Sequence, residues 1–291
     1  MKTYDFIEGE VLAFDKPLTW TSFNLVKVVR NNLSRRLGIK RLKVGHAGTL
    51  DPLASGVMIL CTGKCTKQID QLQAGTKEYI ATLRLGCTTP SFDAEHPIDA
   101  TYPTSHITAE AVSEALGKFK GSIWQVPPVY SAGKVEGRRA FDYVRQGEEV
   151  ELKAKELVID EIELLDLHLP EQGVISPHAA EVAAMAQADI HIKDFKACYA
   201  TSIEDIAAST PESDGVSTES MPYLQIRVVC SKGTYIRALA RDIGQALQSG
   251  AYLIGLRRTR VGSFALADCL PVENVEQWCR EVPMVENKEN K

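Results

Sequence analysis

Hydrophobic residues fall along this chain into short runs that predict strands and into longer stretches whose spacing predicts helices. The clearest strands are a continuous apolar run at 57–61 and two alternating runs, at 79–85 and 223–230; we expect the run at 79–85 to be half-buried. Further strands are predicted at 11–14, 150–153, 157–167, 252–260 and 263–266, and helices at 21–37, 66–73, 108–119, 138–146, 236–247 and 272–280. Because these elements follow one another without regular alternation, we predict an α+β fold rather than a doubly wound α/β sheet.

The helix at 21–37 has signals at both ends and two distinct faces. Thr21 can serve as its N-cap, and Gly38 stops it. An apolar stripe at helical spacing consists of Phe23, Val26, Val29, Leu33 and Leu37. Basic side chains project from the helix and continue beyond it at Lys27, Arg30, Arg35, Arg36, Lys40, Arg41 and Lys43. Such a run is usually a solvated face, but because it leads into a glycine-rich loop we favour contact with a nucleic acid.

That loop, at 45–56, reads GHAGTLDPLASG and precedes the apolar strand at 57–61. Three glycines and a proline in twelve residues predict a backbone that turns tightly and passes close to another group. Asp51 therefore stands on a loop docked against the core, where its carboxylate can be aimed. The alternative interpretation is that Asp51 and Pro52 only form a turn.

Charge is unevenly distributed, and this changes what the net charge of −5 implies. Residues 160–222 hold 13 acidic residues and 2 lysines, so the rest of the chain holds 31 basic and 25 acidic residues, a net charge of +6. Binding RNA requires a local basic face and not a basic total, so a nucleic acid is not excluded. Within the acidic stretch, residues 170–222 are also rich in turn-forming residues, and we interpret them as an acidic, partly flexible surface insertion.

The composition otherwise suits a globular protein of 291 residues, 44% hydrophobic and 24% charged. No apolar run approaches the length of a membrane helix, and the N-terminus lacks the apolar centre of a signal peptide. Seven scattered cysteines do not suggest a disulfide framework, and Cys61 and Cys65 lack a second ligand pair for zinc. We therefore expect a cytoplasmic protein with no membrane association and no bound metal.

Five segments in the same order resemble one enzyme family. They are GHAGTLDP at 45–52, KEY at 77–79, QVPPVYSAGKVEG at 125–137, CSKGTYIR at 230–237 and LRRTRVG at 256–262. These segments are similar to the motifs of the TruB family, the tRNA pseudouridine-55 synthases, with Ala47 in place of the usual threonine. The resemblance covers roughly residues 8–165 and 223–270. It implies the pseudouridine synthase fold, with a mixed, mostly antiparallel central sheet flanked by helices.

The resemblance also implies a role for individual residues. Asp51 matches the catalytic carboxylate, and Arg237 matches its partner, which would keep that carboxylate ionised. From the sequence alone, Arg237 could be a surface arginine, although the first turn of a helix is unfavourable for a cation. We predict a salt bridge between the two.

Five further residues are implied to bind the substrate: His46, Tyr79, Lys134, Tyr235 and Leu256. The two tyrosines would offer ring faces for stacking, Leu256 an apolar wall, His46 a contact to the flipped region of the RNA and Lys134 a phosphate contact. Without the resemblance, the tyrosines and Leu256 would be assigned to the core and His46 to a structural role. A departure from the family follows Leu85, where only Asp93 of an acidic motif remains, and we assign no role to it.

The resemblance divides the chain into a catalytic domain at 1–270, with an RNA-gripping thumb at 124–147 and the insertion at about 170–222, and a C-terminal helix and tail at 271–291. We expect no PUA domain, the RNA-binding module that ends many family members. The implied activity is isomerisation of uridine to pseudouridine at position 55 in the T-arm of tRNA, by a monomer that needs no cofactor and no protein partner. Two alternatives are a guide-RNA-dependent synthase, which the missing PUA domain argues against, and a non-catalytic tRNA-binding or folding factor.

Overall fold

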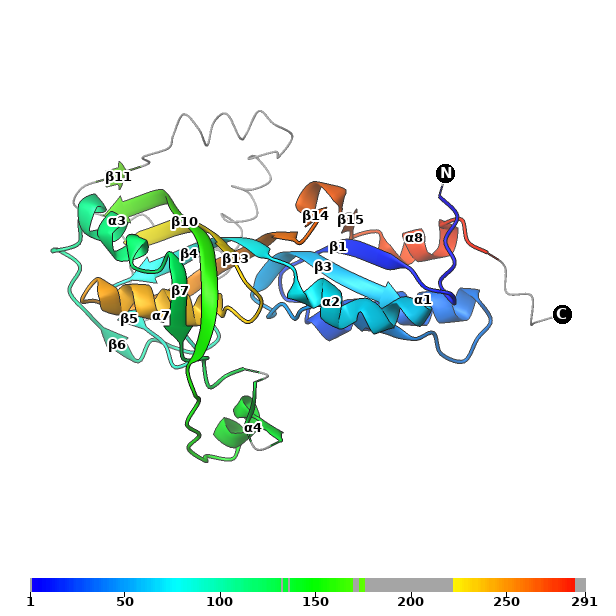
Figure 1. The fold of residues 1–291 in the computed structure, drawn as a ribbon, viewed down its shortest axis with the longest axis horizontal. Coiled ribbons are helices and arrows are strands. Elements are labelled where there is room, and N and C mark those ends of the chain that lie inside the picture. Colours follow the sequence, from blue (N-terminus) through cyan, green and yellow to red (C-terminus); the bar gives the residue numbers. More distant parts are fainter. Residues whose placement is uncertain (1, 132, 136, 170–172, 176–221, 286–291) are drawn as a thin grey trace. The chain divides into compact units, whose positions relative to one another are not determined.

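The structure is a computed structural model that describes residues 2–131, 133–135, 137–169, 173–175 and 222–285 (Figure 1). The chain forms two compact units, one of Met1–Glu78 with Arg257–Lys291 and the other of Tyr79–Leu256. We call them unit 1 and unit 2 and describe each by itself. The chain enters unit 2 within strand β4 (Lys77–Leu85) and leaves it within strand β13 (Ala251–Val261).

Unit 1 is built on a sheet in the order β13–β3–β1–β15, whose central strand β3 (Ala54–Thr62) is buried along its whole length. Its neighbours β1 (Val11–Lys16) and β2 (Val44–His46) both pair with it in antiparallel fashion. His46 lies opposite Leu60, so the residues between β2 and β3 close a hairpin that carries Asp51. At the edges, β14 (Phe264–Ala265) pairs with β13, and β15 (Leu270–Pro271) runs parallel to β1.

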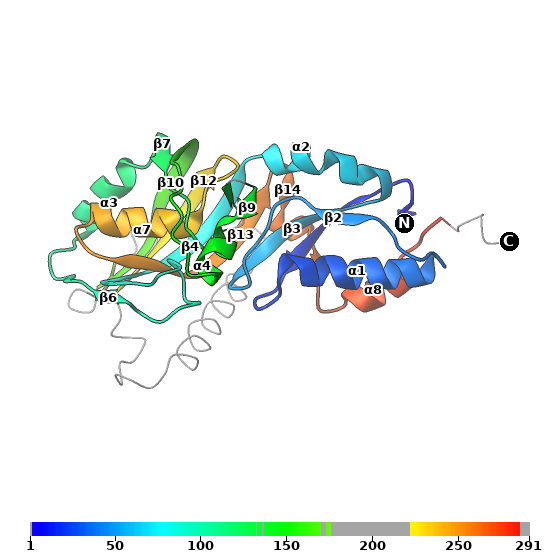
Figure 2. The ribbon, with the colours of Figure 1, turned by 90° about the horizontal axis from the view of Figure 1, so that it is seen from below.

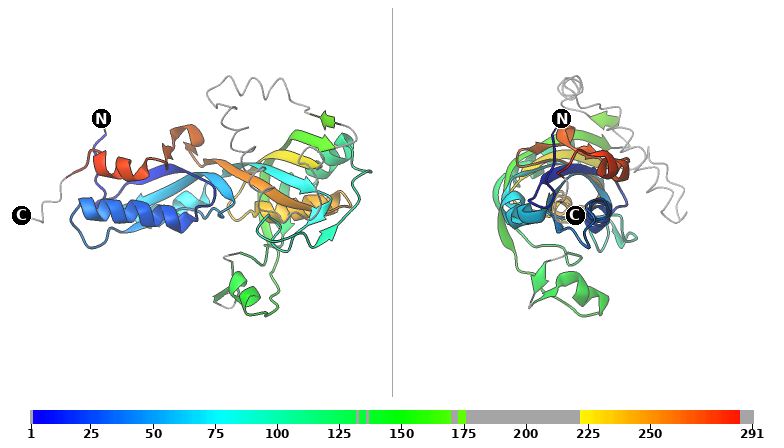
Figure 3. Two further views of the ribbon diagram at one scale, coloured as in Figure 1. Left: turned by 180° about the vertical axis from the view of Figure 1, so that it is seen from behind. Right: turned by 90° about the vertical axis from the view of Figure 1, so that its right-hand side faces the viewer.

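Both faces of β3 are covered, which explains why its sequence is continuously apolar. Met58 and Leu60 belong to a cluster formed with the helices α1 (Ser22–Arg36) and α8 (Val275–Glu281). Val57 and Ile59 belong to a second cluster, which includes residues of α2 (Ile69–Ala74) and of the 3₁₀ turns η1 (Gly63–Gln68) and η3 (Leu266–Asp268). Figures 2 and 3 show α8 lying beside α1.

Unit 2 contains a sheet in the order β11–β10–β12–β4–β13. The long strand β10 (Lys155–Leu169) pairs antiparallel with β7 (Gly121–Gln125), β12 (Tyr223–Cys230) and β11 (Gly173–Ile175). Helices α3 (Ala109–Gly117) and α7 (Ile236–Ala246) contact each other, and α3 also contacts β10. Two short strands, β5 (Cys87–Thr88) and β6 (Ala100–Thr101), form a separate ribbon.

The predicted thumb is a small element of its own that projects from the rest of unit 2 (Figure 1). Its strands β8 (Lys134–Val135) and β9 (Arg138–Arg139) pair with each other and lead into helix α4 (Ala140–Arg145). The Tyr143 hydroxyl donates to the Val135 carbonyl, and the Arg138 guanidinium lies 4.0 Å from the centre of the Tyr143 ring. Arg138 is also ion-paired with Glu148, the residue just beyond the thumb, so its charge is already partly neutralised.

Most predicted elements are confirmed, including the mixed, mostly antiparallel sheet. Thr21 caps α1 by accepting a hydrogen bond from the Asn24 amide, and Thr108 caps α3 in the same way through Ala111. Strand β12 has the predicted bounds. The buried face of α7 consists of the predicted side chains Ile236, Leu239, Ile243 and Leu247, with further alanines and Arg237.

Several details of the prediction are wrong. Phe23 is 59% exposed and does not belong to the buried stripe of α1, which instead includes Leu25. Residues 150–153 form no strand, and the predicted helix at 66–73 consists of η1 followed by α2. Strand β4 is buried on both faces and not half-buried, and it is an interior strand of the sheet, between β12 and β13.

The helix predicted at 138–146 is confirmed only from Ala140 onward, because its first residues form β9. Within the segment predicted as an insertion, at about 170–222, residues 173–175 form β11, which pairs with β10. The prediction stays untested over 170–172 and 176–221, which lie outside the described residues. None of the helices within the described ranges has both the length and the apolar character that a membrane span requires.

Candidate active site

The Asp51 hairpin is held in place by hydrogen bonds to its backbone. The Ser22 hydroxyl, in the first turn of α1, donates to the Leu50 carbonyl at 2.9 Å and accepts from the Leu50 amide at 2.8 Å. One residue beyond Asp51, the Pro52 carbonyl accepts a hydrogen bond from the Thr19 amide at 2.8 Å. These contacts fix the chain on both sides of Asp51, so the carboxylate starts from a defined backbone position.

A buried arginine completes this arrangement from β13. Arg258 is only 2% exposed, and its Nε donates to the Val57 carbonyl at 2.7 Å. Its terminal nitrogens donate to the carbonyls of Gly48 at 3.2 Å and Thr49 at 3.4 Å. Gly56 permits the close approach, because its φ is +105° and a Cβ there would lie 2.2 Å from the Arg258 carbonyl oxygen.

Two further basic groups of unit 1 lie near this hairpin. Lys16 is fully buried, and its ammonium donates to the carbonyls of Pro17 and Trp20 at 2.9 and 2.6 Å. Burial lowers the pKa of Lys16 to about 8, against the opposing influence of the Asp51 charge. Burial also lowers the pKa of His46, while its hydrogen bond to the backbone of Gly48 acts in the other direction. His46 is therefore disposed to be neutral near pH 7.

In unit 2 a second buried arrangement surrounds Arg237, near the start of α7. Arg237 is 7% exposed, and its Nη1 lies 3.3 Å from both the Asp93 carboxylate and the Ser91 carbonyl oxygen. Its Nη2 donates to the Tyr130 carbonyl at 2.9 Å. Asp93 also accepts hydrogen bonds from the Ser91 hydroxyl at 2.6 Å and the Glu95 amide at 3.0 Å. The guanidinium is thus held by three acceptors, one of them a buried carboxylate.

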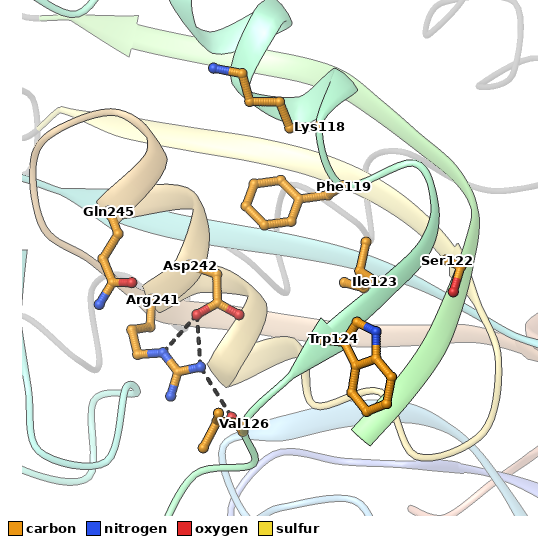
Figure 4. Close-up of a pocket in the computed structure, with 9 residues that line it drawn as sticks. All are labelled: Lys118, Phe119, Ser122, Ile123, Trp124, Val126, Arg241, Asp242 and Gln245. Carbon is orange, nitrogen blue, oxygen red and sulfur yellow. Dashed lines mark hydrogen bonds and ion pairs between the residues drawn. The ribbon is translucent and has the colours of Figure 1, made fainter. Parts of the chain in front are cut away.

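The same helix fixes the chain that leads into the thumb. The buried Gln125 side chain accepts a hydrogen bond from the Tyr235 amide at 2.9 Å, and Arg241 donates to the Val126 carbonyl at 3.0 Å. A hollow of about 670 Å³ lies beside these contacts, lined among others by Arg241 and by Trp124, whose side chain is 70% exposed (Figure 4). Arg237 and Arg241, one helical turn apart, therefore hold successive parts of the thumb segment.

The remaining predicted residues all belong to unit 2. Tyr79 is buried in β4 and Leu256 is half-buried in the neighbouring β13; they are the first and the last residues of unit 2. Lys134 lies in β8, and its side chain is outside what the structure describes. Asp51 and Arg237 belong to different units, so their predicted salt bridge stays a prediction.

One cluster in unit 2 has the composition of a metal site. Asp93, Glu95 and His96 each offer a ligand atom, and these atoms lie within 4.8 Å of one another. Asp93, however, already accepts from Arg237 and Ser91. The ion pair and this hydrogen bond account for its position, and we propose no metal there.

Comparison with known proteins identifies the family. Residues 34–192 match the family model "TruB family pseudouridylate synthase (N terminal domain)", and residues 237–286 match "tRNA pseudouridylate synthase B C-terminal domain". The chain belongs to the TruB family. The pseudouridylate synthases of this family are isomerases.

Close TruB relatives align over nearly the whole chain. The tRNA pseudouridine synthase B of Phocaeicola vulgatus is 55% identical over 274 residues, which is 94% of each chain. The enzyme of the same name from Bacteroides thetaiotaomicron is 53% identical over 98% of this chain and 99% of its own. The predicted family is therefore confirmed.

Solved structures show the same fold at low identity. A Cbf5–Nop10–Gar1 complex matches with a TM-score of 0.55 and 22% identity, and an archaeal box H/ACA Nop10–Cbf5 complex with 0.53 and 20%. Each match covers 94% of this chain but only about half of the other chain, 55% and 54% respectively. At such identity the likeness shows the fold alone, which is the predicted pseudouridine synthase fold.

Sequence reasoning assigned no role to three charged residues that the structure places in these two arrangements: Asp93, Arg258 and Lys16. Asp93 was the remaining acid of an otherwise altered motif, and its partner lies far along the chain. Arg258 stood in the LRRT motif without a role, although a buried arginine requires several acceptors. Lys16 closes an apolar strand before a proline, a position where a lysine is usually solvated. In each case the signal was a charged residue beside a buried strand or motif.

Proposed function

We propose that this chain isomerises uridine to pseudouridine at position 55, in the T-loop of tRNA, and that Asp51 is the catalytic residue. The observation that carries the proposal is the Asp51 hairpin, in which a TruB motif meets backbone clamps from Ser22 and Arg258. Such clamps suit a group that must be aimed within a fraction of an ångström. The relatives named tRNA pseudouridine synthase B support the choice of substrate.

The reaction needs no external reactant. The bond between N1 of uracil and C1′ of the ribose breaks, the base rotates, and C5 bonds to C1′; the proton on C5 is lost and N1 is protonated. Asp51 can serve either by attacking C1′ or by taking a proton from C2′. The two routes make the same demand on the protein, which is an ionised and oriented carboxylate.

The uridine must leave its stack to reach such a group. We assign Tyr79 and Tyr235 to stacking, worth about 1–3 kcal/mol per base, and Leu256 to the apolar wall of the base pocket. His46 would contact the displaced part of the loop, and Lys134 a phosphate. All five remain proposals from the family motifs.

Arg237 is proposed to face Asp51 in the reactive complex. Its anchoring by Asp93, Ser91 and Tyr130 supports this role, because a guanidinium already fixed in position needs little reorganisation to meet a carboxylate. Asp93 would then be a positioning residue that acts through Arg237. We further propose that the enzyme works as a monomer in the cytoplasm, without a protein partner.

Release of tritium from unmodified tRNA labelled at C5 of uridine tests the proposal, because only C5 substitution frees that label. We expect the purified protein to release one label per tRNA, and none from a transcript with cytidine at position 55. A protein that binds and refolds tRNA but releases no label would instead be the non-catalytic folding factor. Light scattering of the active protein tests whether it is a monomer.

A further inference from the structure

The α1 segment is the most one-sidedly charged part of the described chain. Residues 22–48 contain seven lysines and arginines and no aspartate or glutamate. One of the seven, Arg36, has a structural role, because it donates to the carbonyls of Cys279 and Val282 near the end of α8. The other six are Lys27, Arg30, Arg35, Lys40, Arg41 and Lys43, which we call the α1 track.

The α1 track differs from other basic residues of the protein in lacking acidic partners. Within the described ranges none of its six members forms an ion pair, whereas Lys64, Arg227 and Arg280 are each paired with a glutamate. Five of the six are exposed, and Arg30 is half-buried beside the exposed ring of Phe23, at 5.6 Å from its centre. Unneutralised cations on one surface create a positive potential that favours a polyanion.

The α1 track also has a fixed position relative to Asp51 within unit 1. The hydrogen bonds between Ser22 and Leu50 join the start of α1 to the Asp51 hairpin. From there the 15 residues of α1 extend about 22 Å, at 1.5 Å per residue (Figure 2). The far end opens into a polar hollow of about 540 Å³, lined by Arg30, Asn31, Ser34, Arg35, Ile39, Lys40 and Arg41.

A simpler explanation is that these cations only stabilise the C-terminus of α1, where the helix dipole is negative. This explanation covers Arg35 and Arg36, which stand in the last turn. It does not cover Lys40, Arg41 and Lys43, which follow the helix. Three of the last four carbonyls are also already satisfied, since those of Leu33, Ser34 and Arg35 accept from the amides of Leu37, Ile39 and Gly38.

We propose that the α1 track binds the phosphate backbone of the double-helical stem that continues from the T-loop. The inference rests on the proposed function, which places the target uridine at Asp51. An A-form RNA duplex rises less per base pair than the about 3.4 Å of DNA, so a surface of about 22 Å would follow at least about six base pairs. The α1 track would therefore add affinity for RNAs with a long stem, and it would do so without reading their sequence.

The test compares two variants of equal charge on two RNAs. The track variant is Arg35→Gln/Lys40→Gln/Arg41→Gln, and the control is Lys64→Gln/Lys118→Gln/Arg280→Gln, which removes three exposed cations that are ion-paired elsewhere. One RNA is a T-arm hairpin with a stem of about three base pairs, and the other has the same loop on a stem of about twelve. Fluorescence anisotropy at several salt concentrations gives the dissociation constants, and circular dichroism checks that all variants are folded.

We expect the track variant to bind the long RNA about 30-fold more weakly at 0.1 M salt. The slope of the logarithm of the binding constant against the logarithm of the salt concentration should fall in magnitude by about 2–3, while the affinity for the short hairpin changes less than threefold. The control should bind both RNAs like the unmodified protein. An unchanged affinity for the long RNA, or an equal loss on both RNAs, would overturn the proposal. Failure of the proposed function would appear separately, as absence of tritium release from the unmodified protein.

Discussion

The two units hold their key residues in opposite ways. In unit 1, the Asp51 hairpin is fixed through its backbone, by the hydroxyl of Ser22 and the guanidinium of Arg258. In unit 2, Arg237 is fixed through its side chain, by the carboxylate of Asp93 and the carbonyls of Ser91 and Tyr130. The first arrangement defines where a chain segment lies, and the second defines where a charge lies.

This difference predicts how Asp51 and Arg237 respond to substitution. A carboxylate on a clamped hairpin keeps its position when its charge is removed, so its chemistry can be separated from its placement. A guanidinium that is itself held by hydrogen bonds cannot be replaced without losing its position, because its charge and its hydrogen bonds depend on the same nitrogen atoms. The following predictions test that comparison.

The largest effect should come from Asp51→Asn. The change is nearly isosteric and leaves the hairpin clamps intact, so we expect no measurable turnover and a tRNA affinity within a few-fold of the unmodified enzyme. Tritium release and anisotropy provide the two measurements, with the exposed Asp70→Asn as a control that should keep full activity. Activity above a tenth of the original would remove Asp51 from the chemical step.

Arg237→Lys should be nearly as damaging as Arg237→Ala, with kcat reduced about 100-fold or more. An ammonium cannot reach Asp93, Ser91 and Tyr130 at once, and a group displaced by about 1 Å can lose about 10²-fold in rate. Arg241→Lys, one turn further along α7, should cost less than tenfold. If Arg237→Lys kept most of the activity, the side-chain clamp would be unimportant.

Arg258→Met should lower the free energy of unfolding by about 3 kcal/mol, because the buried Val57 carbonyl and the partly buried carbonyls of Gly48 and Thr49 lose their donor. We also expect kcat to fall, since the hairpin loses its support. The neighbouring Arg257→Met, which removes a partly exposed ion pair with Asp15, should be milder. Urea denaturation compares the two variants, and equal losses would contradict a special role for Arg258.

The smallest effect concerns Lys16 and pH. Its folded-state pKa of about 8 lies below the ordinary value of 10.5, so between these values the unfolded chain binds more protons. The destabilising contribution of the Lys16 charge is therefore fully present below pH 8 and is relieved as the pH rises to 10.5. The unmodified protein should gain stability relative to Lys16→Met over this window, as measured by urea denaturation at pH 7.5, 9 and 10. A constant difference would show that the Lys16 ammonium titrates normally.

The sequence by itself determined the elements and the family. Caps such as Thr21 and Thr108 and the alternation at 223–230 act over a few residues, so local patterns suffice to place α1, α3 and β12. The Asp51 loop was recognisable because its glycines and its aspartate are contiguous. Where local and tertiary demands differ, periodicity alone assigned one residue, Phe23, to the wrong face of α1.

Only the tertiary structure decided which charged groups meet. Arg237 reaches the Ser91 carbonyl from 146 residues away, and Arg258 reaches that of Val57 from 201 residues away. No periodic pattern encodes such pairs, because hydrogen bonds between distant elements depend on how strands pair and helices pack. Lys16 and Arg258 look like surface residues in the sequence, but both are buried and donate to backbone carbonyls. Lys16 donates to the nearby Pro17 and Trp20, and Arg258 donates to the distant Gly48 and Thr49.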